Sequence, residues 1–325
     1  MNQTIQKRTI RLATRSSPLA QWQAEHVRQA LLARWPGLEI VRVEITTKGD
    51  RILDQPLADI GDKGLFTKEI EKAMLEGKAD VAVHSLKDLP SRLPPGLMLG
   101  AVLRRTHGGD VLISKNNVPL AELPEGASVA TGSVRRRAQL LHYRPDLKVV
   151  DVRGNLDTRF RKFYEHDWAG MILAEAGVVR LQREDEVTER LLFTVMLPAV
   201  GQGALAVEIR QEDEPLRRMV EPLTDRSTAL SVAAERSFLR RLEGGCQVPI
   251  AARAELREET LTLYGLIADL DGKRLYRSKW SGPPQEAESI GERLAERLLE
   301  EGGRAVLDEI RSARPKSENE NRADE

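Results

Sequence analysis

The sequence is poor in cysteine and in aromatic residues, and neither sign of charge is in excess. Cys246 is the only cysteine in 325 residues, which excludes an internal disulfide framework and is typical of a reducing compartment. Lysine plus arginine and aspartate plus glutamate each number 50, so no overall field favours nucleic acid or a membrane surface. Any cationic site must therefore be local.

Two further absences narrow the class of protein. No apolar run reaches the roughly 18 residues of a transmembrane helix, and the N-terminus MNQTIQKRTI lacks the apolar core of a secretory signal. The five histidines and the single cysteine show no metal-ligand spacing. We therefore expect a cytoplasmic protein with no metal site and no membrane or nucleic-acid partner.

Strands and helices alternate along the first two thirds of the chain, which predicts α/β domains with parallel, doubly wound sheets. Strands are expected at 8–13, 41–45, 80–83 and 97–103, then at 110–114, 128–130, 148–152 and 171–174. The strand at 204–209 is expected to return to the first domain. Three strands and a helix between 248 and 299 predict a small α+β third domain.

The expected domains are 1–104 with 200–222, then 105–199, then 223–312, followed by a disordered polar tail at 313–325. The charged stretch at 47–64 is too long for a simple connector and is expected to be a mobile loop, either a lid or disordered.

Cys246 follows a glycine pair in the run Glu243-Gly-Gly-Cys246-Gln-Val-Pro249. Glycines that accept positive φ end a helix and allow close approach of another surface. A free cysteine at such a place is either a small buried hydrophobe or a reactive, modified thiol. The stretch alone leaves both interpretations open.

Arginines gather where predicted helices begin. Ser133 is a candidate N-cap, which puts Arg135 and Arg136 in the first helical turn, where the macrodipole is positive and cations are disfavoured. Arg153 precedes another helix, and Arg15 precedes a helix capped by Ser17. Each arginine alone could meet a nearby carboxylate, but the set favours a small polyanionic ligand.

Asp88 is the best acid/base candidate, because it follows a buried strand in the run His84-Ser-Leu-Lys-Asp88. An aspartate before Leu-Pro also forms turns, and His84 has the structural alternative of a satisfied buried histidine. These residues alone do not decide between the two roles.

Read together, seven stretches resemble the porphobilinogen deaminase (hydroxymethylbilane synthase) family. They are LATRSSPLAQWQA from Leu12, VAVHSLKDLP from Val81, TGSVRRRAQL from Thr131, VRGNLDTR from Val152, AEAGVVRL from Ala174, LPAVGQGALAVE from Leu197 and EGGCQVPIAA from Glu243.

The resemblance implies a monomeric transferase that joins four porphobilinogen molecules head to tail, with loss of ammonia, to give hydroxymethylbilane. It implies two periplasmic-binding-protein-like domains, with the site between them, and a third domain that presents Cys246. That cysteine would hold a dipyrromethane cofactor through a thioether, and Asp88 would be the catalytic residue. The implied cofactor-binding residues are Ser85, Lys87, Thr131, Ser133, Arg135, Arg136, Arg159 and Gln202, and the implied substrate-binding residues are Arg15, Ser17, Lys63, Arg153 and Arg180.

The chain departs from the family pattern in two places. It has Arg105-Thr-His-Gly-Gly-Asp110 where an Asp-Pro-Arg-Asp-like run is common, and Asp59 where some members carry lysine. The alternatives from other classes are a non-catalytic two-lobed binding protein for a polycarboxylate and a ligand-sensing regulator. The first gives no role to Cys246, and the second lacks a recognisable helix-turn-helix.

Overall fold

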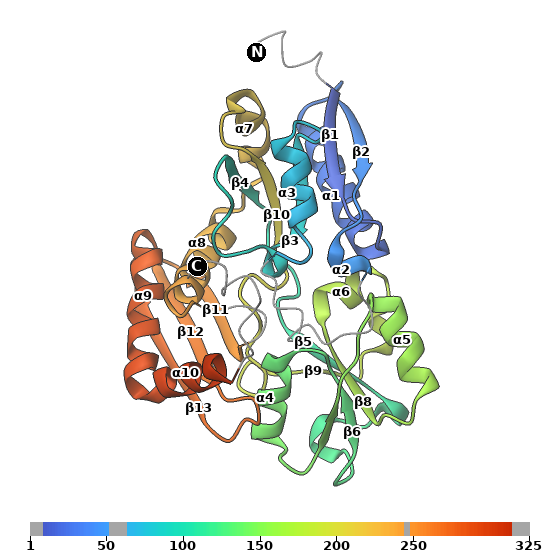
Figure 1. The fold of residues 1–325 in the computed structure, drawn as a ribbon, viewed down its shortest axis with the longest axis vertical. Helices are drawn as coiled ribbons and strands as arrows, with labels where there is room; N and C mark the ends of the chain where they lie inside the picture. Colours follow the sequence, from blue (N-terminus) through green and yellow to red (C-terminus); the bar gives the residue numbers. More distant parts are fainter. Residues whose placement is uncertain (1–8, 52–63, 244–247, 314–325) are drawn as a thin grey trace, which may run out of the picture.

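The computed structural model describes residues 9–51, 64–243 and 248–313. Within this part of the chain the strands form two five-stranded sheets and one three-stranded sheet. In Figure 1 the first sheet lies at the top, the second at the lower right and the three-stranded sheet at the lower left. The α/β class with a small third unit, predicted from the sequence, is confirmed.

The first sheet has the order β2-β1-β3-β10-β4. Its strands are β1 (Thr9–Thr14), β2 (Glu39–Glu44), β3 (Val81–Ser85), β4 (Leu97–Val102) and β10 (Leu205–Arg210). Its helices are α1 (Pro18–Arg34), α2 (Lys48–Arg51), α3 (Lys68–Leu75) and α7 (Glu214–Val220). Ser17 caps α1 by accepting a hydrogen bond from the Ala20 amide, and Pro18 opens the helix, as predicted.

The second sheet has the order β7-β6-β8-β5-β9. Its strands are β5 (Asp110–Ser114), β6 (Ser128–Ala130), β7 (Lys148–Val150), β8 (Gly170–Ala174) and β9 (Glu189–Arg190). The helices α4 (Val134–Tyr143), α5 (Leu156–Glu165) and α6 (Glu175–Arg180) follow β6, β7 and β8 in turn. Helix α6 also contacts α1 of the first sheet.

The expectation of parallel sheets is right for three neighbouring strands in each sheet and wrong for the fourth. Strands β2, β1 and β3 are parallel, as are β7, β6 and β8, but β10 and β5 run antiparallel to their neighbours. The reason is connectivity. Strand β5 enters the second sheet from the first sheet, and β10 enters the first sheet from the second. Neither is preceded by the helical crossover that brings a chain back to start a parallel strand in the same sheet.

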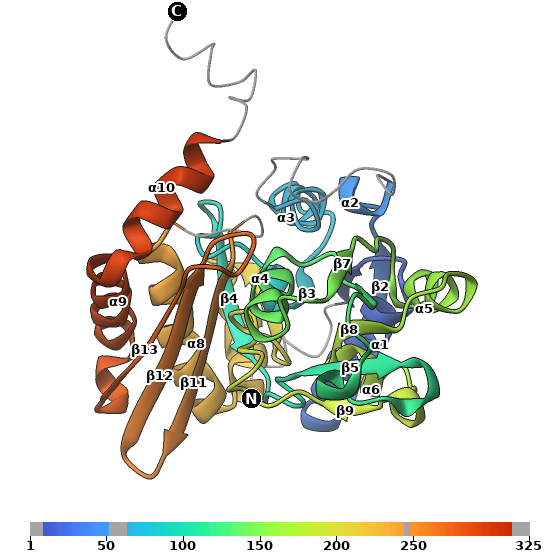
Figure 2. The ribbon, with the colours of Figure 1, turned by 90° about the horizontal axis from the view of Figure 1, so that it is seen from below.

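The third sheet has the order β11-β12-β13 and is antiparallel throughout. It consists of β11 (Ile250–Arg257), β12 (Thr260–Ala268) and β13 (Leu275–Gly282), with the helices α8 (Arg226–Arg241), α9 (Ala287–Leu298) and α10 (Arg304–Ser312). Phe238 of α8 and Leu294 of α9 both pack over Gly265, so the two helices cover one face of this sheet. Figure 2 shows α9 and α10 beside β12 and β13.

The first two sheets are joined by two stretches of chain, 103–109 after β4 and 191–204 before β10. Glu235 of α8 lies where these stretches meet the third sheet and is fully buried. Its carboxylate accepts hydrogen bonds from the Arg105 guanidinium (2.8 Å), the Gly201 amide (2.8 Å) and the Ala254 amide of β11 (2.8 Å). One side chain therefore connects all three units.

None of the helices in the described ranges is long and apolar enough to cross a membrane. Of the expected mobile loop at 47–64, the structure describes Thr47, α2 and Gly64, and residues 52–63 lie outside the described part.

Candidate active site

A one-turn 3-10 helix, η1 (Leu86–Asp88), follows the end of β3 and carries the candidate catalytic residue. Leu86 and Leu89 are buried on either side, and the Leu86 amide donates to the Ala204 carbonyl at 3.1 Å. Lys87 and Asp88 lie between these leucines and are only half-buried. The apolar anchors thus hold two charged side chains at the carboxyl end of a central strand, where α/β sheets collect ligands.

The first turn of α4 carries the arginine pair. Ser133 caps this helix by accepting from the Arg136 amide, and Thr131 accepts from the Ser133 amide at 3.3 Å. Arg135 and Arg136 are both buried. Their guanidinium groups meet one carboxylate, that of Asp110, with nitrogen–oxygen distances of 2.8 Å each.

Asp110 is the first residue of β5 and is 1% exposed. Burial raises the pKa of its carboxyl, but the charges of Arg135 and Arg136 lower that pKa by more than burial raises it. The net result is a pKa of about 2. The Gln202 amide also donates to this carboxylate at 3.1 Å and to the Gly109 carbonyl at 2.8 Å. The sequence required an anion at this helix start, and the structure supplies one from the protein. The arginine pair is therefore not in itself a sign of a ligand.

Two further arginines of the second sheet lie in this region. Arg159 of α5 donates from Nε to the Gly154 carbonyl at 2.9 Å, and burial together with the charges of Arg136 and Arg153 lowers its pKa to about 10. Arg153 is buried, and its Nη1 has no hydrogen-bond partner. Buried guanidinium N–H groups without acceptors are costly, which makes this a place that favours an incoming carboxylate.

Residues of the first two sheets interact electrostatically across this region. Burial lowers the pKa of Lys87 to about 8, while the charges of Asp88 and Asp110 raise it and those of Arg136 and Arg135 lower it. Asp88 in turn raises the pKa of Arg159. We call these residues the cleft cluster: Lys87, Asp88, Asp110, Arg135, Arg136, Arg153 and Arg159. Its cations outnumber its carboxylates, so it suits a ligand that carries several carboxylates.

Arg15 and Ser17 form a second group at the start of α1. The Arg15 Nε lies 3.1 and 3.2 Å from the two oxygens of Asp50 in α2, and its guanidinium stacks 4.3 Å from the centre of the Phe66 ring. Asp50 also accepts from the Thr47 hydroxyl at 2.7 Å. Arg15 thus already has a carboxylate partner, which a ligand would have to replace.

Arg180 and Ser85 complete the described candidates. Arg180 donates to the Gly203 carbonyl at 2.8 Å and lies 5.5 Å from the Trp22 ring of α1, while its Nε is buried without a partner. Burial lowers its pKa to about 10. The Ser85 hydroxyl accepts from Gln23 at 2.8 Å. Arg180, like Arg153, therefore has a donor to spare for a carboxylate.

Cys246 and Lys63 lie outside the described residues, and so does Asp59. Helix α8 ends at Arg241, shortly before Cys246 in the sequence. Lys87, Arg135, Arg136 and Arg159, which are predicted to hold dipyrromethane, fit its carboxylates chemically, because their positive charges outnumber the single Asp110 carboxylate that pairs with them. Among the candidates, the unpaired buried guanidinium atoms belong instead to Arg153 and Arg180, which are predicted to bind substrate.

Sequence reasoning missed Asp110, which pairs with the buried arginines, and Glu235, which connects the three units. Asp110 was identified only as the start of a strand. A lone acidic residue between Gly109 and the apolar run Val111–Ile113 is the signal that could have found it, because an acid there needs a buried cation.

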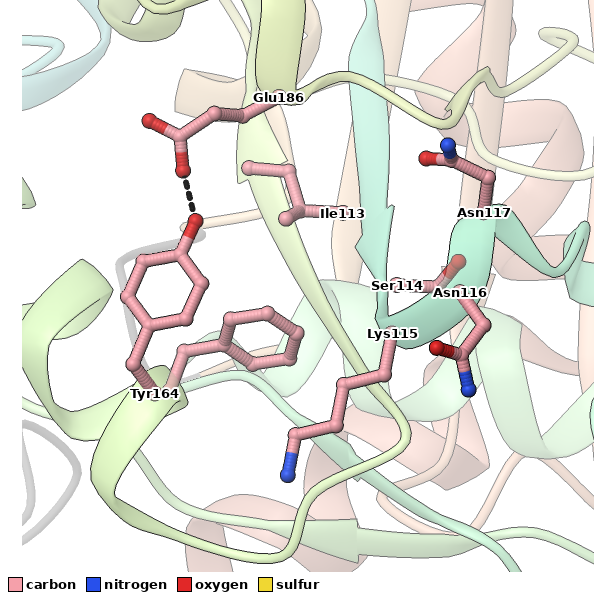
Figure 3. Close-up of a pocket in the computed structure, with 8 residues that line it drawn as sticks. Ile113, Ser114, Lys115, Asn116, Asn117, Tyr164 and Glu186 are labelled. Atoms are coloured by element: carbon pink, nitrogen blue, oxygen red, sulfur yellow. Dashed lines mark hydrogen bonds between the residues drawn. The ribbon is translucent and has the colours of Figure 1, made fainter.

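A pocket of about 360 Å³ lies elsewhere, against the end of β5 and helix α5 (Figure 3). Lys115 at its edge already donates to the His166 carbonyl at 2.8 Å, and Tyr164 is hydrogen-bonded to Glu186. It contains none of the predicted site residues. Nor does any part of the described chain contain a cluster of three metal-ligating side chains.

Comparison with known proteins identifies the family. The family model "Porphobilinogen deaminase, dipyromethane cofactor binding domain" matches residues 10–218, and "Porphobilinogen deaminase, C-terminal domain" matches residues 229–300. A porphobilinogen deaminase of Syntrophotalea carbinolica is 51% identical over 298 residues, covering 92% of this chain and 95% of the relative. One of Syntrophomonas wolfei is 51% identical over 304 residues, covering 94% and 99%.

Among solved structures, the transcriptional regulator CbnR of the LysR family aligns with a TM-score of 0.42 and 14% identity, over 66% of this chain and 68% of that one. A likeness this distant supports no conclusion about this chain. The family models and the curated relatives are sufficient, and they favour the enzyme over the non-catalytic binding protein. The chain belongs to the porphobilinogen deaminase family.

Proposed function

We propose that this chain carries out the porphobilinogen deaminase reaction with Asp88 as its catalytic acid and base and Cys246 as the residue that holds the dipyrromethane cofactor. The reaction joins four porphobilinogen molecules head to tail and releases ammonia with each unit. The observation that carries the assignment of roles is the cleft cluster, in which Asp88 interacts electrostatically with its neighbour Lys87 and with Arg159 of the second sheet.

The cofactor, when bound, supplies the pyrrole carbon to which the first substrate is joined. For each unit added, one carbon–nitrogen bond breaks, one carbon–carbon bond forms, and ammonia and one proton leave. Positive charge develops on the substrate pyrrole as ammonia departs. A fixed carboxylate beside the ring nitrogen stabilises that charge, and the same carboxylate can hold the proton that leaves. Asp88 is accessible between two buried leucines and suits both tasks.

The arginines fall into two groups, according to whether their guanidinium N–H groups already have hydrogen-bond partners in the protein. Arg153 and Arg180 have buried N–H groups without partners, which supports direct binding of substrate carboxylates. Arg135 and Arg136 share Asp110, so they offer their remaining charge from fixed positions to the cofactor. Arg159 and Lys87 add positive charge beside Asp88. For the remaining assigned residues, Arg15, Ser17, Lys63, Ser85, Thr131, Ser133 and Gln202, the roles stay those that the family resemblance implies.

We further propose that the protein acts as a cytoplasmic monomer on a small-molecule substrate, without nucleic acid or membrane partners. The balanced charge supports this, because it provides no field for such surfaces. Size-exclusion chromatography with light scattering measures the oligomeric state directly.

The test has two parts. The intact mass of the active protein should exceed the sequence mass by one dipyrromethane, and Cys246→Ser should abolish that increment. Asp88→Asn should keep the increment while ammonia release from porphobilinogen falls by about 10²–10⁴-fold, the usual contribution of a general acid–base group. Asp167→Asn, an exposed carboxylate outside the cleft cluster, is the matched control and should leave the rate unchanged. An unmodified mass in active protein, or normal turnover in Asp88→Asn, contradicts the proposal.

A further inference from the structure

Arg236 of α8 has an unusual set of partners for a buried arginine. It is 8% exposed, and its guanidinium donates to three consecutive backbone carbonyls, those of Leu89 (3.4 Å), Pro90 (2.7 Å) and Ser91 (3.1 Å). Burial is the main cause of its lowered pKa of about 10. A buried cation held by neutral carbonyls is a poor source of stability, so its position calls for another explanation.

The three carbonyls belong to the residues that directly follow Asp88 in the chain. On the other side of Asp88, the Leu86 amide is bonded to the Ala204 carbonyl, and Leu86 is buried. The turn that carries Asp88 is thus fixed before it by the first sheet. After it, the turn is fixed by buried Leu89, which lies in one apolar cluster with Val232 of α8, and by the hydrogen bonds of Arg236. Removing Arg236 would leave the apolar contact and release the hydrogen bonds that set the path of the backbone after Asp88.

Helix α8 belongs to the third unit, not to the sheet that carries Asp88. The same helix ends at Arg241, shortly before Cys246. Glu235, the residue before Arg236, accepts hydrogen bonds from the two stretches that join the first two sheets. One helix therefore contacts the segment of the catalytic aspartate and leads to the residue that holds the cofactor.

We infer that Arg236 is a positioning residue, which sets the place of Asp88 relative to the cofactor attached at Cys246. It does so through the carbonyls of Leu89, Pro90 and Ser91. This inference rests on the proposed function, because it presumes the roles of Asp88 and Cys246.

The test compares Arg236→Met, Arg236→Lys and the control Arg240→Met. Arg240 lies one turn further along α8 and forms an exposed ion pair with Glu288 at 3.1 Å. For each variant we would measure the intact mass, the thermal midpoint, and kcat and KM for porphobilinogen.

Arg236→Met should keep the cofactor mass and lose kcat by up to about 10²-fold, the effect of a small displacement of a catalytic group. Its KM should change little, because no substrate contact is removed. Arg236→Lys should recover part of kcat, since an ammonium can donate to some of the carbonyls. Arg240→Met should match the wild type.

A purely structural role predicts a lower thermal midpoint with normal kcat in the folded protein, and that result overturns the inference. If Arg236→Met does not fold, Arg236→Lys decides: a kcat equal to wild type overturns the inference, and a lowered kcat with unchanged KM supports it. Absence of the cofactor mass in wild type would instead contradict the proposed function itself.

Discussion

Asp110 balances the charges of the buried arginine pair. Its carboxylate receives Arg135, Arg136 and Gln202, three side chains assigned to the cofactor. Without an anion, the two guanidinium groups at this helix N-terminus would repel each other, and the positive end of the helix dipole would repel both. Asp110 therefore keeps the pair in place before any ligand arrives.

Asp110→Asn should destabilise the protein by about 3–5 kcal/mol at pH 7, because it leaves two buried guanidinium groups without their anion. Asp271→Asn is the control, since Asp271 forms only an exposed contact with Arg137, and it should cost about 0–1 kcal/mol. Urea unfolding measures both. Equal losses in the two variants would contradict the importance of the buried carboxylate.

The pH dependence of this contribution has a definite sign. The folded pKa of Asp110 is about 2, below its ordinary value of 3.8, so the unfolded chain binds a proton more readily. The part of this stability that depends on pH is complete above about pH 4, amounts to about 2 kcal/mol, and is lost as pH falls towards 2. The stability gap between wild type and Asp110→Asn should narrow over that range.

The arginines show what a sequence can and cannot establish about single residues. The dipole argument predicted correctly that an anion lies at the start of α4, because that follows from local chain order. It could not tell a protein carboxylate from a ligand, since Asp110 reaches the pair only through the tertiary fold. The same holds for Arg236, whose partners are far away in the sequence.

At the scale of elements, the locally encoded features were predicted well. The caps at Ser17 and Ser133 are present, and the strand at 128–130 has the expected bounds. Helix α10 was missed although its buried Val306, Leu307 and Ile310 stand at helical spacing, whereas the two-residue strand β9 is too short to show any periodicity. The reversed direction of β5 and β10 was also missed, since strand direction is set by the route of the chain and not by side-chain periodicity.

The turn η1 depends on a glycine in a distant segment. Gly201 has φ +72°, and a Cβ there would lie 2.1 Å from Leu86 Cδ2. Gly201→Ala should therefore cost about 3 kcal/mol or more and lower kcat, because Leu86 must move and Asp88 is in the same turn.

Gly126→Ala is the matched control for Gly201→Ala. Gly126 has φ +74° with no atom within 4 Å of the added Cβ, so only the backbone penalty of about 1–2 kcal/mol applies. Thermal unfolding and turnover measure both variants. If the two lose equal stability and activity, the contact between Gly201 and Leu86 does not support the turn.

At the scale of the whole molecule, Glu235 connects the three units through one buried carboxylate. We expect wild type to unfold in one calorimetric transition. Glu235→Gln removes the charge that compensates buried Arg105, should cost about 3–5 kcal/mol, and should make the third unit unfold separately.

Glu288→Gln serves as the control for Glu235→Gln, since its ion pair with Arg240 is exposed. It should keep the single transition and cost about 0–1 kcal/mol. A single transition at the wild-type temperature in Glu235→Gln would show that the units are held together by other contacts.

The exchanged strands also limit how this protein can be divided. Strand β10 lies between β3 and β4, yet it is made only after the whole second sheet, and β5 reaches the second sheet directly from β4. A fragment that stops before residue 205 leaves β4 without the strand that joins it to its sheet. During synthesis the first sheet therefore closes only after the second sheet's sequence has left the ribosome, and the two lobes must mature as one unit.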